Sequence, residues 1–160
     1  MLIAAGSPLA GLAALAANRV LDGLDGAVAR LSGPTDRGAF LDITLDFIVY
    51  ASVPFGFACA DPASNALSAA ALLFAFMGTA SSFLAFAVLA ERRRLGSTAY
   101  PHKGLYYLGG LAEGGETIAC FVAMCLAPGW FAVLAWGFAA LCAVTTATRL
   151  LWGIQAFGHR

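Results

Sequence analysis

The chain has 160 residues, of which 61% are hydrophobic, and its mean hydropathy is +0.82. Only 11% of the residues are charged, against roughly 25% in ordinary globular proteins, so the composition excludes a water-soluble domain. Nine Lys and Arg residues balance nine Asp and Glu residues, and this zero net charge gives no reason to expect nucleic acid as a partner. We therefore expect a single all-α domain over residues 1–160, a polytopic transmembrane helix bundle.

Five complete membrane spans are predicted, because apolar runs near the length that crosses a bilayer recur along the chain. In chain order they cover about residues 8–25, 38–60, 66–90, 104–126 and 131–152. Polar or turn-forming residues separate them, including 61–65 and 127–129. In this topology all nine basic residues lie nearer one side of the membrane, and the opposite turns carry none. The positive-inside rule places that basic side in the cytoplasm.

Four aspartates stand out in this apolar background. Asp22 and Asp25 are three residues apart, and Asp42 and Asp46 are four apart, so each pair shares one face of a helix. The turn signal Ser32-Gly33-Pro34 separates the two pairs and predicts two helices joined by a tight loop. Carboxylates near lipid usually face a polar cavity, and a cluster of four would repel itself without a cation among its oxygens. Ligands that are all oxygen favour Mg²⁺ or Mn²⁺ over zinc.

The same stretch follows the pattern D-x2-D-G-x2-A-R, seven intervening residues, then G-x3-D-x3-D. This pattern resembles the signature of the CDP-alcohol phosphatidyltransferase family, in its bacterial inner-membrane branch. Each fixed position of the signature is present: Asp22, Asp25, Gly26, Ala29, Arg30, Gly38, Asp42 and Asp46. Stretches 18–26, 82–86 and 109–116 also look like that branch, so the resemblance extends over nearly the full length.

The resemblance implies a metal-dependent phosphotransferase. Such enzymes transfer a substituted phosphate from a CDP-alcohol, often CDP-diacylglycerol, to an acceptor alcohol and release CMP, in phospholipid biosynthesis. By similarity, Asp22, Asp25 and Asp42 would bind two Mg²⁺ or Mn²⁺ ions, and Asp46 would be both ligand and general base. The CDP-alcohol site would comprise Gly26, Ala29, Arg30, Thr35 and Gly38. Relatives have six spans, form homodimers and lie in the bacterial inner membrane, with membrane lipids around them and the active site facing the cytoplasm.

Further polar residues are candidates for the acceptor pocket or for support of the metal ligands. Glu113 and Glu116, within the fourth predicted span, would line the pocket, bind a cation, or hydrogen-bond to neighbouring helices. Asn18 shares a face with Asp22 and would orient that ligand. Arg19 would meet an anionic acceptor or lipid head group, or merely extend to the membrane surface. Arg149, near the cytoplasmic end of the last span, is a candidate for binding an acceptor phosphate.

Two alternatives to an active enzyme stay open. Relatives normally carry an N-terminal surface helix and a first span before the aspartate helix, and residues 1–5 resemble only the last turn of that span. The chain would then be a catalytically incomplete fragment of the family. The second alternative is a cation-conducting membrane protein whose acids line a permeation path. This alternative does not explain four other positions of the signature: Gly26, Ala29, Arg30 and Gly38.

Overall fold

The computed structural model describes residues 2–33, 35–93, 112 and 114–158, apart from the side chains of residues 25, 28–30 and 32. Within these ranges every regular element is helical, which confirms the predicted all-α fold. The elements are α1 (Pro8–Ser32), α2 (Asp36–Ala60), α3 (Pro62–Arg92), α4 (Gly114–Leu126), the 3₁₀ turn η2 (Pro128–Trp130) and α5 (Phe131–Phe157).

Three segments of the described chain are long and apolar enough to cross a membrane, namely α2, α3 and residues 128–157, which join η2 to α5. They correspond to the second, third and fifth predicted spans. Helix α1 has 25 residues, but it contains four charged residues, which lower its hydropathy: Arg19, Asp22, Asp25 and Arg30. Of the fourth predicted span, residues 104–111 and 113 lie outside the described residues. The described part of this span is mainly α4, an apolar helix of 13 residues. These elements make a polytopic helical membrane bundle.

Helix ends lie where turn chemistry predicts them. Gly33 follows α1 with a φ of 90°, a conformation that glycine adopts without steric cost. Thr35 caps α2, because its Oγ1 accepts a hydrogen bond from the Gly38 backbone N–H at 3.1 Å. Asp61 ends α2 and caps α3, accepting from the Ser64 N–H at 3.2 Å. Hydrogen bonds from the Ser64 hydroxyl and backbone hold the pKa of the Asp61 carboxyl below its usual range.

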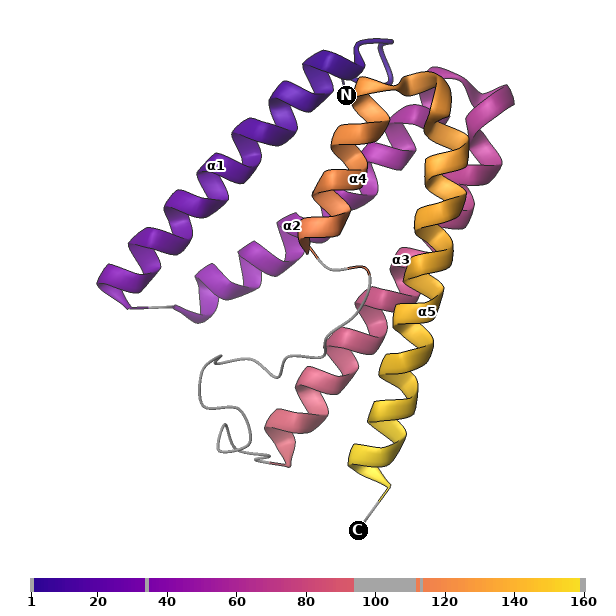
Figure 1. The fold of residues 1–160 in the computed structure, drawn as a ribbon. Helices are drawn as coiled ribbons and strands as arrows, with labels where there is room; N and C mark the ends of the chain where they lie inside the picture. The colour runs from indigo at the N-terminus through magenta and orange to yellow at the C-terminus, as the bar shows by residue number, and fades with distance from the viewer. Residues whose placement is uncertain (1, 34, 94–111, 113, 159–160) are drawn as a thin grey trace.

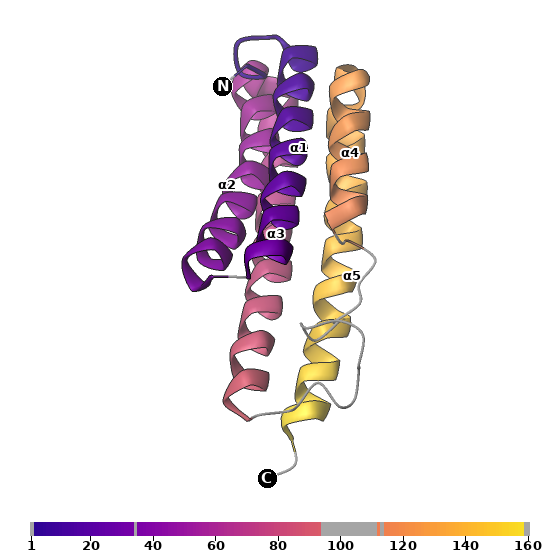
Figure 2. The ribbon, with the colours of Figure 1, turned by 90° about the vertical axis from the view of Figure 1, so that its left-hand side faces the viewer.

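Helices α3 and α5 run side by side and form the main packed pair of the bundle (Figures 1 and 2). Gly78 allows their close approach, since a Cβ there would lie 2.9 Å from Oγ1 of Thr146. At the C-terminal end of both helices, a guanidinium nitrogen of Arg93 donates to the Phe157 carbonyl at 3.1 Å. The Arg93 guanidinium also lies 5.2 Å from the centre of the Phe157 ring. This pair is therefore held along its length by packing and at its end by a polar contact.

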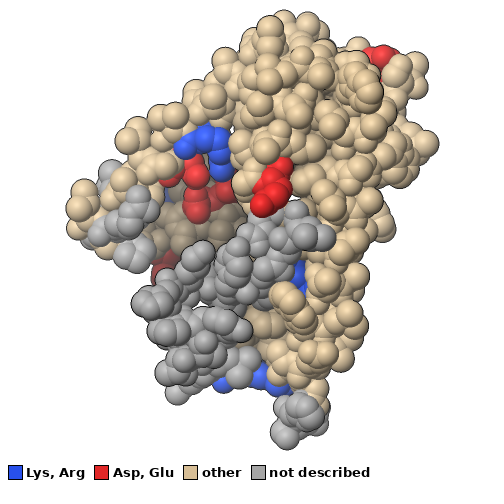
Figure 3. All heavy atoms as spheres, in the orientation of Figure 1, with Lys and Arg blue, Asp and Glu red and all other residues tan. Residues whose placement is uncertain are grey.

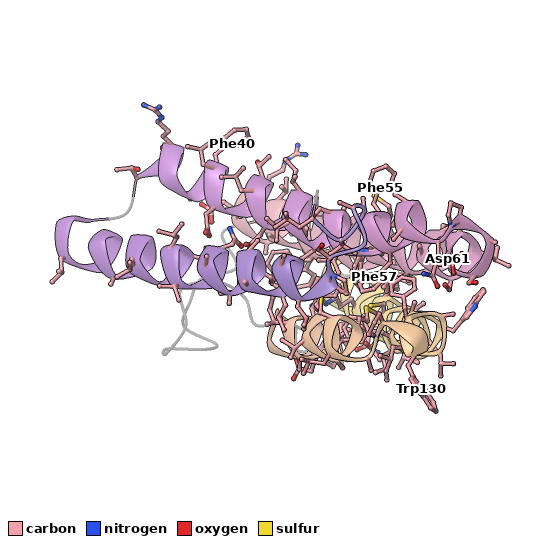
Figure 4. The ribbon with its side chains drawn as sticks, turned by 90° about the horizontal axis from the view of Figure 1, so that it is seen from above. Phe40, Phe55, Phe57, Asp61 and Trp130 are labelled. Carbon is pink, nitrogen blue, oxygen red and sulfur yellow. The ribbon has the colours of Figure 1, made fainter. Side chains whose placement is uncertain are left out.

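Aromatic side chains connect α2 and α4 to this pair. Phe57 of α2 stacks on Phe131, with ring centres 4.4 Å apart, and Phe121 of α4 makes an edge contact with Phe76 of α3 at 6.1 Å. In Figure 4 Phe57 points into the bundle, whereas Phe55 of the same helix points away from it. Because Phe55 is 49% exposed in the isolated chain, we assign its side to the lipid-facing surface.

The first described residues form a turn that packs between α1 and α2. The Gly6 N–H donates to the Ile3 carbonyl at 2.9 Å, and Ile3 is buried. Its side chain lies against glycines on both helices, Gly11 of α1 and Gly56 of α2, and a Cβ at Gly56 would lie 3.0 Å from the Ile3 Cβ. The described part of residues 1–5, which resemble the last turn of a span, thus packs between α1 and α2.

Candidate active site

The aspartates lie where α1 and α2 face each other, closer to the connection between these helices than Ile3 is (Figure 1). Helix α1 carries Asp22, and helix α2 carries Asp42 and Asp46 one turn apart. Asp42 lies close enough to Asp22 for their carboxyl groups to interact directly, and it also interacts electrostatically with Asp46. The structure therefore places three of the four predicted metal ligands on two neighbouring helices, and their role as ligands stays a prediction. The side chain of Asp25 lies outside the described residues.

Arg19 is the centre of the polar contacts in this site. Its Nη2 atom lies 2.5 Å from Oδ1 of Asp46, across the gap between α1 and α2. Its Nη1 atom lies 3.4 Å from Oδ2 of Asp22 on its own helix. Nε and Nη2 also donate to Oδ1 of Asn18, at 3.1 and 2.7 Å. One guanidinium thus contacts both halves of the aspartate cluster.

This arrangement differs from the roles that the sequence suggested for Asn18 and Arg19. Asn18 was expected to orient Asp22, but its described hydrogen bonds hold Arg19 instead. Arg19 was expected to meet an acceptor or lipid head group or to reach the membrane surface, but it turns inward to the carboxylates. The reason is electrostatic, because a guanidinium gains more from two partly desolvated carboxylates than from water at the membrane surface.

The cluster is accessible from outside the bundle. The side chains of Arg19, Asp22 and Asp46 keep 22%, 35% and 30% of their surface exposed. Figure 3 shows basic and acidic atoms gathered in a hollow of this face of the molecule. Ions and polar groups of a substrate can therefore reach the carboxylates without the helices separating.

Tyr50 belongs to this site, although the sequence analysis missed it. The Arg19 guanidinium lies 5.7 Å from the centre of its ring, within the range of a cation–π contact. The ring also meets Phe121 edge-on at 6.0 Å, and a Cβ at Gly114 would lie 3.5 Å from its hydroxyl oxygen. Tyr50 follows Asp46 by four residues, so the spacing 42, 46, 50 along one face of α2 was the signal that could have found it.

The predicted donor-binding residues are only partly described. Gly26, Ala29 and Arg30 lie on α1, and the side chains of Ala29 and Arg30 lie outside the described residues. Thr35 and Gly38 form the N-terminal cap of α2. A Cβ added at Gly38 would lie 3.1 Å from Oγ1 of Thr35. The small size of Gly38 therefore serves the cap.

The remaining candidates are Arg149, Glu116 and Glu113. Arg149 is buried at the α3–α5 interface, where its Nη1 donates to the Thr79 carbonyl at 3.1 Å and its guanidinium lies 5.6 Å from the Phe83 ring centre. These contacts tie it to α3 rather than to the aspartates. Glu116 lies exposed in the first turn of α4, and Glu113 lies outside the described residues.

An apolar cavity of about 270 Å³ adjoins the ionic cluster between α1 and α2. Asn18 lies at the boundary of the two, since it both lines the cavity and binds Arg19. The rest of the lining is almost entirely apolar or small: Leu2, Ile3, Gly11, Ala14, Leu15, Val49, Ser52, Val53 and Gly56. A charged site and an apolar space therefore lie next to each other along the same pair of helices.

Comparison with known proteins identifies the family of this chain. The sequence model of the CDP-alcohol phosphatidyltransferase family matches residues 1–148. The chain belongs to this family. It is also 58% identical over 151 residues to the inner membrane protein YnjF of Escherichia coli (strain K12), an alignment that covers 94% of this chain and 73% of YnjF. No solved structure matches it. Membership of the family supports transfer of phosphate from a CDP-alcohol to an acceptor alcohol at a membrane.

The divalent cations expected from the sequence stay a prediction, and the chemistry of the acids is the observation that bears on it. Among the side chains that the structure describes, no three acids converge on one point as the ligands of an ion would. The donor set is nonetheless suitable, because Asp22, Asp42 and Asp46 supply hard oxygen ligands from two facing helices in one accessible hollow. Their excess negative charge is offset by Arg19, the basic side chain that contacts two of them.

Proposed function

We propose that this family member transfers a phosphatidyl group from CDP-diacylglycerol to an acceptor alcohol, releasing CMP, as a step of phospholipid biosynthesis. The observation that carries the proposal is the hollow in which carboxylates of α1 and α2 meet, next to an apolar cavity. A lipid donor needs both environments side by side. Its diphosphate requires a site for charge, and its acyl chains require apolar space.

In this proposal the aspartates divide the work of the reaction. Asp22, Asp25, Asp42 and Asp46 would hold two Mg²⁺ or Mn²⁺ ions, and these ions would neutralise the negative charge of the diphosphate. Asp46 takes the proton of the acceptor hydroxyl. The acceptor oxygen then forms a bond to the phosphorus that bears the lipid, and the bond from that phosphorus to the CMP oxygen breaks. Proton transfer to a positioned carboxylate is typically worth about 10²–10⁴-fold in rate.

Residues of the α1–α2 connection are proposed to hold the donor. Arg30 offers a planar fork of N–H donors that suits a phosphate, and Gly26 and Ala29 leave room on the same helix for the nucleotide. Thr35 and Gly38 present the N-terminal end of α2 to this region. Backbone N–H groups at a helix N-terminus favour negative charge.

The cation-conducting alternative is less consistent with the observed contacts. Arg19 places a positive charge between Asp22 and Asp46, 2.5 Å from the latter. A cation that passed through this hollow would meet that charge, whereas a phosphate-binding site gains from it. The contacts of Arg19 thus favour a site that binds cations together with an anionic substrate.

The function is tested by incubating membranes that contain the protein with labelled CDP-diacylglycerol and a panel of alcohols: glycerol phosphate, inositol phosphate, serine and another lipid. We expect CMP release to rise above that of membranes without the protein for one class of acceptor. The lipid product should carry that acceptor in a phosphodiester bond. A protein that binds Mn²⁺ but releases no CMP with any acceptor would contradict the proposed reaction.

We also propose that the site faces the cytoplasm of a bacterium whose inner membrane holds the protein. The α1–α2 connection and the C-terminal ends of α3 and α5 lie toward one end of the bundle, and the α2–α3 turn and η2 lie at the other (Figure 1). Arg37, Arg92 and Arg93 are at the first end, whereas residues 61–67 and 126–131 contain no Lys or Arg. The positive-inside rule therefore supports a cytoplasmic site.

Single-cysteine labelling tests this orientation, after the four native cysteines have been replaced. We expect an Arg92→Cys protein to react with a membrane-impermeant thiol reagent only in inverted vesicles. The matched Ser64→Cys protein, with its cysteine at the opposite end, should react in intact spheroplasts. The reverse pattern of labelling would show that the basic end faces the periplasm.

A further inference from the structure

Arg19 contacts the same carboxylate oxygens that the proposed function assigns to metal ions. Its Nη2 lies 2.5 Å from Oδ1 of Asp46, and its Nη1 lies 3.4 Å from Oδ2 of Asp22. A divalent cation would bind such oxygens at about 2.0–2.1 Å for Mg²⁺. A cation bound by the Asp46 carboxylate would then lie within a few ångströms of the guanidinium. Their mutual repulsion would make the two arrangements alternatives.

The surroundings of Arg19 allow it to leave Asp46 without leaving the site. Asn18 Oδ1 accepts hydrogen bonds from Nε and Nη2, and the ring of Tyr50 lies 5.7 Å from the guanidinium carbon. Neither of these partners is a predicted metal ligand. Asn18 precedes Arg19 on α1, and Tyr50 is one turn beyond Asp46 on α2, so both remain near the guanidinium if its contact with Asp46 is lost. The side chain also keeps 22% of its surface exposed, which leaves room for this movement.

We propose that Arg19 is a displaceable counter-ion of the aspartate site. It neutralises Asp46 and joins α1 to α2 when no divalent cation is bound, and it moves off Asp46 when a cation binds. This inference rests on the proposed function, because it assumes that the aspartates are metal ligands. It implies that Arg19 lowers the affinity for the cation and stabilises the cation-free protein.

The test measures Mn²⁺ binding to the purified protein in detergent, from the electron paramagnetic resonance signal of free Mn²⁺. We expect Arg19→Gln to bind Mn²⁺ at least about tenfold more tightly than the wild type, because a positive charge beside the site is removed. Arg19→Lys keeps the charge but loses the planar fork that holds Asp46, so a smaller gain of about threefold is expected. Arg92→Gln removes a charge at the exposed end of α3 and should leave the affinity unchanged.

Thermal unfolding of the same proteins gives a second readout that does not depend on activity. Without divalent cations, Arg19→Gln should unfold at a lower temperature than the wild type, since the contact between α1 and α2 is lost. At saturating Mn²⁺ the difference should close, because Arg19 no longer binds Asp46 in either protein. If Arg19→Gln is too unstable to purify, the Mn²⁺ affinity and unfolding of Arg19→Lys decide the question alone.

Two results would overturn the inference, and they differ in what else they affect. Unchanged or weaker Mn²⁺ binding by Arg19→Gln and Arg19→Lys, with a wild type that binds Mn²⁺ and releases CMP, rejects the counter-ion role and leaves the proposed function standing. Absence of Mn²⁺ binding by the wild type and all variants rejects the metal assignment of the aspartates and this inference with it.

Discussion

Replacing Asp46 by Asn is expected to abolish phosphatidyl transfer while sparing much of the affinity for the CDP-linked donor. The amide cannot take the proton of the acceptor hydroxyl, and loss of a general base typically lowers the rate by about 10²–10⁴-fold. Donor binding depends mainly on the other ligands and on the residues proposed to hold the nucleotide. The measurement is CMP release and CDP-donor binding on the same preparation, with any N-terminal segment that the natural protein carries included.

Asp22→Asn and Asp42→Asn are the matched controls for this change. Both remove a charge from the same hollow, but their side chains are proposed as metal ligands without a role in proton transfer. We therefore expect them to weaken metal-dependent donor binding as well as turnover. A modest loss of donor binding in Asp46→Asn is compatible with its second role as a ligand. Near-normal turnover of Asp46→Asn would refute its assignment as the base.

Removal of divalent cations is expected to have an effect of similar size. Excess chelator should reduce CMP release to background, and Mg²⁺ or Mn²⁺ should restore it, because the cations would neutralise the diphosphate as CMP departs. Zn²⁺ should restore it poorly, since the proposed ligands are all carboxylates and zinc sites in proteins favour nitrogen and sulfur. The check is a titration of each cation into chelator-treated and dialysed protein.

The control for chelation is a measurement that shows whether the protein stays folded. Far-ultraviolet circular dichroism of the chelator-treated protein should be unchanged, because the helices pack through α3 and α5 and through aromatic contacts that involve no cation. Undiminished CMP release in excess chelator would remove the metal assignment. It would leave the aspartates as a cluster that Arg19 alone neutralises.

Local features of the site could be predicted from the sequence because they depend on residues close together in the chain. The pairing of Asp42 with Asp46 on one helix face needs only the helical repeat, and the break at Gly33 needs only turn chemistry. The apolar runs placed α2, α3 and α5 within a few residues of their observed ends. The order of the signature likewise pointed to the family to which the chain belongs.

The contacts between helices were decided by the tertiary structure. Arg19 and Asp46 are 27 residues apart, and they meet because α2 runs back beside α1 after α1 ends (Figure 1). Arg149 faces α3 because α5 packs there. A short stretch of sequence shows the helical period, but it does not show which other helix will pack against each face of that helix. The sequence by itself thus determined the acids, their spacing and the spans, while packing decided that Arg19 and Tyr50 join the acids and Arg149 does not.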